Sequence, residues 1–313
     1  MDILADVLFP IFRETVISLL PLLPYAVLLI CVAFVAFLIK VHFYKKSTYH
    51  RITHNTYLSV RFDLGKYGEY LIYKELRHLE KEGAKFLFNA YIPKEDGSTT
   101  EIDVLMICPK GVFVFESKNY SGWIFGNEKQ PKWTQTLPRG RGKSHKEQFL
   151  NPIIQNKVHI NHLCSLIGDD IPIYSVIVFS DRCTLKDITT DSADIPVINR
   201  HNITSTVIQV CEHTSECLAK DTVNEIYDKL YPFTQVDIKV KADHIAKIHE
   251  KTTAQKQPDV IVTDTAKPTP DGIPKCPRCG SDLVLRCTKR GEKAGKQFYG
   301  CSAYPKCRYT KEP

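Results

Sequence analysis

Four cysteines near the C-terminus have the spacing of a metal site. They are Cys276, Cys279, Cys301 and Cys307, with two residues inside the first pair, 21 between the pairs and five inside the second. Thiolate sulfurs bind zinc at ~2.3 Å, and four of them form a closed tetrahedral site with no open position for catalysis. A segment of about 40 residues has too small a core to fold alone, so the metal must supply much of its stability. The sequence therefore predicts a structural zinc module.

A second group, in the middle of the chain, combines two carboxylates with a lysine. Asp103 lies in one expected strand, and Glu116-Ser117-Lys118 ends the next. If Cys108 pairs with Gly111 across a tight turn, Asp103 lies opposite Glu116 and Lys118 lies two residues further along the same face. A bulge at Gly111 would shift this register by one residue, and both registers are open.

Two carboxylates in an apolar strand pair need a cation. Buried like charges are costly unless they are paired or bind a metal ion. Mg²⁺ binds one or two carboxylates together with waters and phosphate oxygens, and a lysine can orient the attacking water and offset negative charge on phosphate. A simple Asp–Lys or Glu–Lys salt bridge at a sheet edge is the alternative, and the motif alone leaves both interpretations open.

The elements that position these residues follow from the apolar periodicity. They mix helices with strands, which predicts an α/β (α+β) domain with a mixed sheet. The basic stretch Pro138–Lys146 is expected to be a loop, either tracking a phosphate backbone or simply solvated. Strands are expected at Phe86–Ile92, Thr100–Ile107, Val112–Ser117 and Ile173–Phe179, and helices at Gly65–Glu82, Val158–Ile167 and Ile203–Leu230.

Three segments of this domain resemble a known family. They are GKYGEYLIYKEL at 65–76, EIDVLMICPKGVFVFESKNYSG at 101–122 and NPIIQN at 151–156. Together they resemble the nuclease-related domain family, NERD, over about residues 60–200. The resemblance implies a restriction-endonuclease-like PD-(D/E)xK core and phosphodiester hydrolysis with Mg²⁺ or Mn²⁺.

The same resemblance implies roles for individual residues. Asp103 and Glu116 are expected to hold the catalytic metal, and Lys118 to be the catalytic lysine. Glu69 on the first helix is expected near the metal, and Gln155 is expected to support the site.

The cysteine module has its own likeness. CPRCGSDLVLR at 276–286 and GKQFYGCSAYPKC at 295–307 resemble the zinc ribbons of bacterial type IA topoisomerases, which implies binding to single-stranded DNA. Residues 273–313 hold ten Lys or Arg and three Asp or Glu, a difference equal to the whole chain's net charge of +7. A basic module favours a polyanion partner, although basic tails can also serve solubility alone. Aromatic residues among these cations suit base stacking, with Phe298 expected instead in the small core. They are Phe298, Tyr299, Tyr304 and Tyr309.

An uncharged segment near the N-terminus predicts a membrane anchor. Residues 16–39 carry no charge, and about 20 apolar residues cross a bilayer as a helix. A cleaved signal peptide needs a basic start and a shorter apolar core, and a buried core helix is the other alternative. Basic residues are denser after the segment than before it, which places the C-terminal side in the cytoplasm, at the cell (inner) membrane. Eleven cysteines without a disulfide framework fit that reducing compartment.

The predicted organisation has five parts. They are an anchor at 1–40, a connector at 41–60, a nuclease-like domain at 61–241, a flexible linker at 242–274 and a zinc ribbon at 275–313. The predicted function is a membrane-anchored, metal-dependent nuclease that acts on DNA with single-stranded regions. The alternative is a catalytically inactive, membrane-tethered nucleic-acid-binding or adaptor protein.

Overall fold

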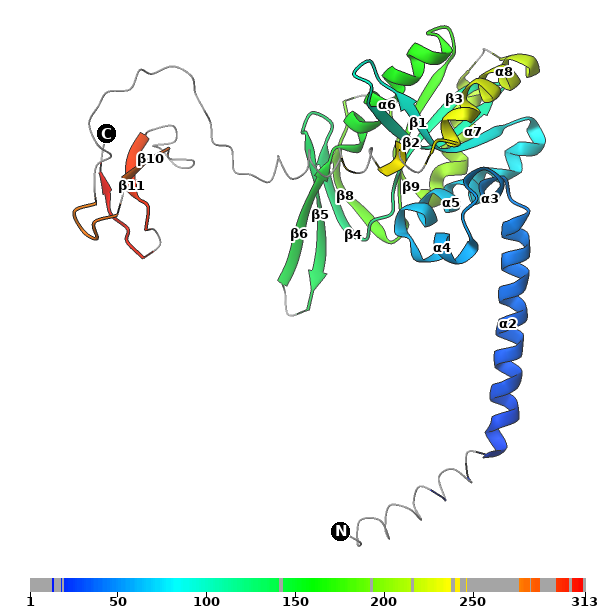
Figure 1. The fold of residues 1–313 in the computed structure, drawn as a ribbon, viewed down its shortest axis with the longest axis horizontal. Coiled ribbons are helices and arrows are strands. Elements are labelled where there is room, and N and C mark those ends of the chain that lie inside the picture. The colour runs from blue at the N-terminus through cyan, green and yellow to red at the C-terminus, as the bar shows by residue number, and fades with distance from the viewer. Residues whose placement is uncertain are drawn as a thin grey trace. The chain divides into compact units, whose positions relative to one another are not determined.

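The chain forms two compact units, which Figure 1 colours from N- to C-terminus. The units comprise Met1–Ala254 and Gln255–Pro313. Most of the predicted linker 242–274 and the start of the predicted membrane segment lie outside the described residues. The computed structural model describes residues 13, 18, 20–140, 143–191, 194–214, 217–237, 240–242, 246, 276–281, 283–287, 297–303 and 306–311.

One long apolar helix lies near the N-terminus. Helix α2 (Leu23–Lys45) follows a short 3-10 turn, η1 (Leu20–Leu22). It is long and apolar enough to cross a membrane, and none of its most apolar stretch is buried in the protein. This exposure argues against the core-helix interpretation.

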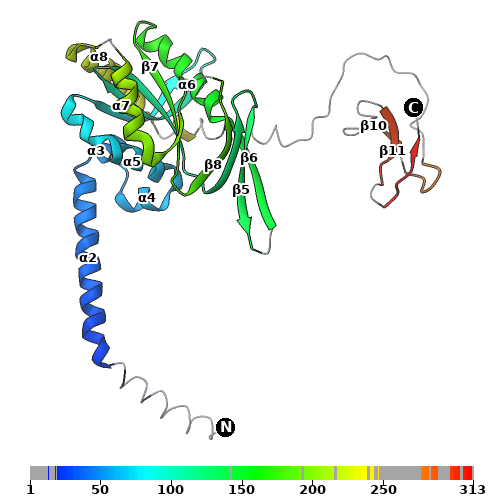
Figure 2. The same cartoon turned by 180° about the vertical axis from the view of Figure 1, so that it is seen from behind.

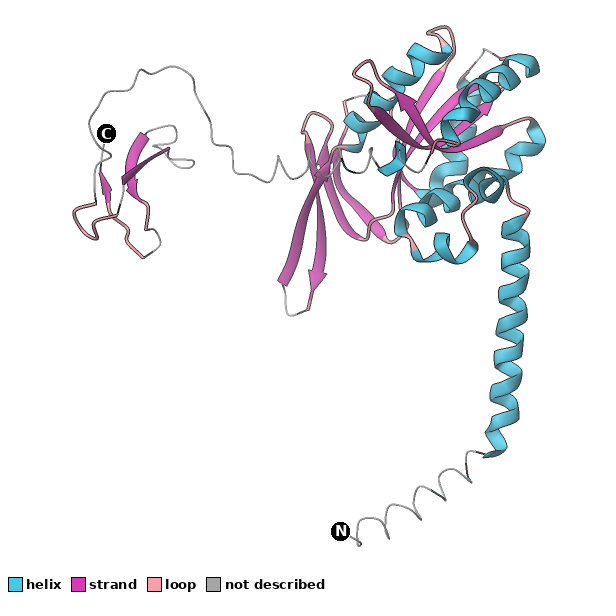
Figure 3. Ribbon diagram, in the orientation of Figure 1, coloured by secondary structure: helices cyan, strands magenta, loops and turns pink. Residues whose placement is uncertain are grey.

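The first sheet carries the residues of the second chemical group. Its five strands have the order β1-β2-β3-β7-β9 and form a mixed sheet, as predicted. The first three strands are antiparallel neighbours, and β7 and β9 join in parallel. Figure 3 shows the strands in magenta and the helices in cyan. The bounds are β1 Lys85–Pro93, β2 Thr99–Cys108, β3 Gly111–Lys118, β7 Ile173–Phe179 and β9 Val197–Asn199.

The β2–β3 hairpin has the tight-turn register. Cys108 pairs with Gly111, and Val104 pairs with Phe115. Gly111 has a φ of 130°, and a Cβ there would lie 2.4 Å from the Pro172 carbonyl oxygen, so only glycine fits. This register, continued by one pair, places Asp103 opposite Glu116, and the bulged alternative is excluded.

Helices cover both faces of this sheet. A Cβ on Gly68 of α5 would lie 2.8 Å from Ser117 Oγ, whereas Gln155 of α6 accepts a hydrogen bond from Lys118. Because Ser117 and Lys118 are adjacent in a strand, their side chains point to opposite faces. Figure 2 shows the fold from behind, with the helices on the face that is turned away from the reader in Figure 1. The bounds are α5 Leu64–Leu76, α6 Pro152–Ile167, α7 Ile203–His213 and α8 Lys220–Leu230, with 3-10 helices η2 Arg77–Glu82, η3 Arg200–Asn202 and η4 Tyr231–Thr234.

Helix boundaries differ from the predictions in three places. The helix predicted for residues 65–82 is α5 followed by the 3-10 helix η2. Helix α6 begins six residues before the predicted Val158, because Asn151 caps it and Pro152 suits a first turn. The single helix predicted for residues 203–230 is two helices, since the chain becomes extended at Thr214.

A second sheet was not predicted. It has the order β6-β5-β4-β8 and buries Ile124 and Trp133 against Phe179. The predicted loop over Pro138–Lys146 is wrong, because most of it belongs to two paired strands. The bounds are β4 Gly122–Asn127, β5 Lys132–Arg139, β6 Lys143–Leu150 and β8 Cys183–Thr189.

The segment expected to be a connector contributes to the core. It contains the end of α2 and two short helices, α3 (Thr48–Thr53) and α4 (Tyr57–Phe62). Tyr49 and Tyr44 are fully buried, and the Tyr49 ring packs edge-on to Phe88 of β1 at 4.7 Å between centroids. Large aromatic rings contribute much buried area, so this segment belongs to the folded domain.

Candidate active site

The two carboxylates and the lysine meet at one end of the β2–β3 hairpin. Lys118 Nζ donates hydrogen bonds to Glu116 Oε1 at 2.5 Å and to Gln155 Oε1 at 3.2 Å. The Ser117 backbone N–H donates to Asp103 Oδ2 at 2.8 Å. Four of the predicted site residues therefore lie in one connected cluster.

Glu69 reaches the same region from α5. Its Oε2 accepts hydrogen bonds from the Tyr49 hydroxyl at 3.0 Å and from Asn89 Nδ2 at 3.1 Å. Asn89 has a φ of 50°, a left-handed conformation that asparagine tolerates better than most residues. The charge of Glu69 also raises the pKa of Asp103, so Glu69 is a neighbour of the cluster.

Burial and neighbouring charges perturb every acid in the cluster. Burial, and then the Glu116 charge, raise the pKa of Asp103 well above its usual range. Burial raises the pKa of Glu69 to about 7. Burial also opposes ionisation of Glu116, but Lys118 and His159 outweigh it and lower the pKa of Glu116. The pKa values of Asp103 and Glu69 are thus raised beside Glu116, whose pKa is lowered.

Lys118 is a stable cation in these surroundings. Burial disfavours its charged form, but Glu116 and Asp103 together raise the pKa of Lys118 to about 12. A lysine that stays charged can donate hydrogen bonds but cannot serve as a general base at neutral pH.

The donor set fits a divalent cation. Glu116 Oε2 is fully buried and has no hydrogen-bond partner among the described residues. The acids outnumber the one lysine, and after burial the Glu116 charge is the next largest cause that raises the pKa of Asp103. Carboxylate oxygens are the ligands that Mg²⁺ and Mn²⁺ prefer, and a bound ion would remove the repulsion. Asp103 and Glu116 are the residues that would hold it.

A cleft of about 510 Å³ gives access to this cluster. Asp103, Lys118 and Gln155 line it from one side. Apolar side chains from the second sheet and α6 form its rim, among them the exposed Leu150 and Ile154. A polar centre with an apolar rim is typical of ligand-binding clefts.

His159 is a site residue that the sequence analysis missed. Its Nδ1 is 2.6 Å from Thr100 Oγ1, and its Nε2 is 3.3 Å from Glu116 Oε2, outside hydrogen-bond geometry. His159 lies four residues after Gln155, on the same face of α6. That spacing was the available signal, once the helix was known to begin at Pro152.

The NPIIQN segment explains how Gln155 and His159 are positioned. The Asn151 side chain accepts from Ile153 N as the helix cap, and its Nδ2 donates to three carbonyls of the β4–β5 turn. Asn156 donates to the Val114 carbonyl in β3. Both ends of this segment are therefore fixed to sheets, so the first turns of α6 hold a defined position.

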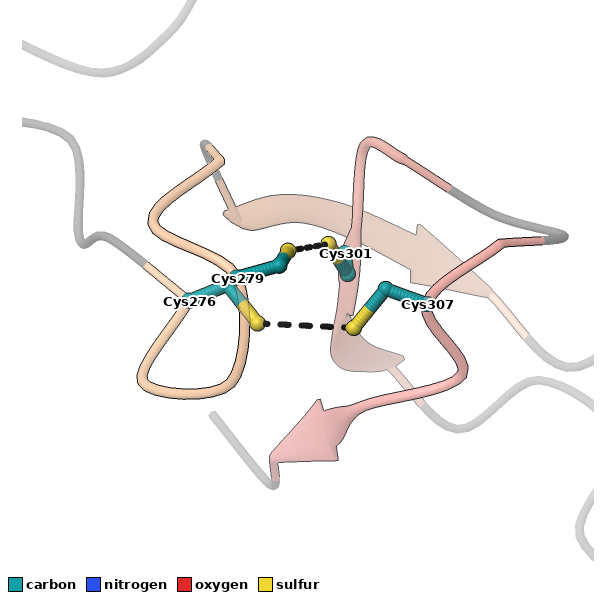
Figure 4. A group of neighbouring side chains, drawn as sticks. All are labelled: Cys276, Cys279, Cys301 and Cys307. Atoms are coloured by element: carbon teal, nitrogen blue, oxygen red, sulfur yellow. Dashed lines mark hydrogen bonds between the residues drawn. The ribbon is translucent and has the colours of Figure 1, made fainter.

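The four cysteines of the second unit converge on one point (Figure 4). Cys276 Sγ is 3.8 Å from Cys307 Sγ, and Cys279 Sγ is 3.3 Å from Cys301 Sγ. A tetrahedron with Zn–S bonds of ~2.3 Å has S–S edges of about 3.8 Å, so the set fits structural zinc. The surrounding strands are β10 Leu283–Cys287, β11 Gln297–Cys301 and β12 Thr310–Lys311.

The zinc-site surface carries cations and half-buried tyrosines. Arg278, Lys306 and Arg308 are exposed and line a hollow of about 340 Å³ beside Cys279 and Cys307. The predicted stacking residues divide into two groups. Tyr299 and Tyr309 pack against the cysteine cluster, whereas Tyr304 and the Phe298 side chain lie outside the described residues.

Comparisons with known proteins agree with the two-part organisation. The family model described as nuclease-related domain matches residues 64–180. The model described as topoisomerase DNA binding C4 zinc finger matches residues 273–313. No solved structure matches the chain.

Two kinds of relatives are found. An uncharacterised protein of Bacillus anthracis is 34% identical over 193 residues, which cover 61% of this chain and 86% of that protein. DNA topoisomerase 1 of Pyrococcus furiosus is 50% identical over 50 residues, 16% of this chain and 4% of the enzyme. The corresponding enzyme of Archaeoglobus fulgidus is 53% identical over 38 residues, 12% of this chain and 5% of the enzyme. In these two enzymes the likeness covers only a small module.

Proposed function

Because the chain belongs to the nuclease-related domain family, we propose that it is a membrane-anchored, metal-dependent DNA nuclease of the PD-(D/E)xK type. The observation that carries this proposal is the cluster of the buried Glu116 with the half-buried Asp103 and Lys118, which opens into a cleft and leaves one carboxylate oxygen without a hydrogen bond. A structural salt bridge needs one acid for one lysine, whereas this site places several acids around a single lysine.

Each residue has a defined part in hydrolysis. Asp103 and Glu116 would hold Mg²⁺ or Mn²⁺, which would supply positive charge to polarise the phosphodiester. Glu116 and Gln155 take two of the three Nζ hydrogens of Lys118, and Lys118 donates the third to a phosphate oxygen, stabilising the negative charge that develops there. Gln155 thereby fixes the direction of the lysine. Water adds across one P–O bond, which leaves a phosphate monoester and a hydroxyl group.

The zinc ribbon supplies affinity for single-stranded DNA in this proposal. The hollow lined by Arg278, Lys306 and Arg308 presents three cations that suit a phosphate backbone. Affinity for DNA through such contacts falls as salt rises. Loss of these cations should therefore weaken binding without changing the cleavage chemistry.

Helix α2 serves as a single-pass anchor. The basic residues Lys45 and Lys46 at its end, followed by Arg51, support an orientation with the C-terminal side in the cytoplasm by the positive-inside rule. This orientation puts both the cleft and the ribbon in the compartment that contains DNA.

A cleavage assay tests the proposed activity. The full chain, in detergent micelles with bound zinc, is incubated with supercoiled, linear and single-stranded DNA and with RNA, in Mg²⁺ or Mn²⁺. We expect metal-dependent cleavage that is lost in Asp103→Asn and kept in Asp228→Asn, a matched change at an exposed position on α8. Tight binding without cleavage of any substrate, equal in both variants, would support the catalytically inactive alternative.

A further inference from the structure

Helix α4 exposes apolar side chains on its outer surface. Leu58 and Phe62 are 50% and 83% exposed, and Leu64 at the start of α5 is 63% exposed. We refer to these three residues as the α4 patch. Leu58 and Phe62 are four residues apart and share one helix face, whereas Val60 is buried in the core. Phe62 is the most exposed large apolar side chain of the described residues, and such a grouping marks an interaction surface.

The α4 patch adjoins the C-terminal end of the apolar helix α2. The ring of Tyr57 packs edge-on against Phe37 at 5.9 Å and against Tyr44 at 5.5 Å between centroids. The Tyr44 hydroxyl donates to the Asn55 carbonyl at 2.8 Å. These contacts fix α4 beside the last turns of α2.

The length of α2 determines the depth of these contacts relative to a bilayer. The 23 residues of α2 span about 35 Å, and a hydrocarbon core is about 30 Å thick. If α2 crosses the core, its last turns emerge among the headgroups. Tyr44 and Tyr57 then lie in the interfacial zone, where aromatic rings with a polar end are enriched.

The charge around the α4 patch complements an anionic lipid surface. Residues 40–66 contain six Lys or Arg and a single acid, Asp63. Asp63 is occupied as the cap of α5, since its side chain accepts from Lys66 N at 3.1 Å. Apolar side chains surrounded by cations are typical of segments that bind the surface of anionic membranes.

We propose that Leu58, Phe62 and Leu64 insert into the interface of the bilayer that α2 crosses, while the nearby Lys and Arg side chains contact anionic headgroups. The occupant is the lipid surface because α4, which carries most of the patch, packs through Tyr57 against the last turns of the anchor. This inference rests on the proposed anchoring by α2. Its consequence is that the catalytic domain is docked on the membrane in a fixed orientation rather than hanging from a free tether.

Tryptophan quenching in nanodiscs tests the docking. The full chain carries one added tryptophan at a time, and the bilayer contains anionic lipid with brominated acyl chains, which quench only indole groups that touch them. Phe62→Trp reports on the patch, and its exposed position accepts the larger ring without repacking. Val32→Trp on α2 reports on the anchor, and Ile208→Trp on α7 is an exposed control. Trp123 and Trp133 are common to all samples, so the unsubstituted chain gives the background.

The three variants separate the possible results. Docking predicts that Phe62→Trp and Val32→Trp each lose most of their added fluorescence, whereas Ile208→Trp does not. If only Val32→Trp is quenched, the anchoring is supported and the docking is refuted. The patch would then bind a protein partner or a second copy of the chain. If Val32→Trp is not quenched either, both the anchoring and the docking are refuted.

Discussion

Replacing Glu69 by Gln should make the protein more stable at pH 8 but not at pH 5. Glu69 is buried, and burial raises its pKa from 4.5 to about 7. The folded state therefore binds the Glu69 proton more tightly than the unfolded state does. This contribution to stability is fully present below about pH 4.5 and is lost as pH rises through about 7. Gln has no proton to lose, so the variant keeps that stability.

The size of the effect follows from the shift. One pKa unit corresponds to about 1.4 kcal/mol, so the change from 4.5 to about 7 is worth roughly 3 kcal/mol at pH 8. Gln also retains an oxygen that can accept from Tyr49 and Asn89, the two donors that Glu69 uses. In a domain of this size, roughly 3 kcal/mol corresponds to a melting-temperature rise of about 6–12 °C.

Calorimetry of the full chain in detergent, without added Mg²⁺, measures this difference. Wild type and Glu69→Gln are compared at pH 5 and pH 8. The expected result is nearly equal melting temperatures at pH 5 and a higher one for the variant at pH 8. A variant that is less stable than wild type at pH 8, or a difference independent of pH, would refute the reasoning about buried carboxylates.

Three further perturbations test other parts of the account. Cys279→Ser should abolish zinc binding and remove the unfolding transition of the ribbon, because the metal supplies the ribbon's stability. The unfolding transition of the larger unit should not change, and a shift of both transitions would contradict this. Asn151→Ala should destabilise the larger unit by about 2–3 kcal/mol in chemical unfolding, because the helix cap and the hydrogen bonds to carbonyl oxygens are lost. The control Asn161→Ala, at an exposed position, should change the free energy of unfolding little. Mn²⁺ affinity, measured by titration calorimetry, should rise with pH because the pKa of Asp103 is raised above its ordinary value and the ion must displace its proton. An affinity independent of pH would contradict the assignment of Asp103 as a ligand.

The hairpin at the centre of the site could be predicted from sequence for local reasons. Pro109 and Gly111 specify a tight turn, and the Gly111 position has no room for a side chain. Once the turn is fixed, the register follows, and with it the pairing of Asp103 with Glu116. The cysteine spacing is likewise a local signal, and the structure brings all four sulfurs together.

The second sheet could not be predicted because its strands lack the usual alternation. Strand β6 reads KSHKEQFL and buries little, so its sequence suggests a basic loop. Its place depends on long-range contacts, such as Trp133 stacking on Phe179 at 6.1 Å. Helix α6 was partly missed because a Pro and an Asn at its start were not recognised as a first turn and its cap, and that error concealed His159.

The single-turnover rate of phosphodiester cleavage by Lys118→Met shows whether Lys118 belongs to an active site. Methionine removes the charge and keeps the length of the side chain, and the matched control is Lys132→Met at an exposed position of β5. With saturating Mn²⁺ and DNA, we predict that Lys118→Met cleaves about 10²–10³-fold more slowly than wild type while binding DNA equally well. Cleavage at the wild-type rate would contradict the assignment of Lys118 and, with it, the proposed active site.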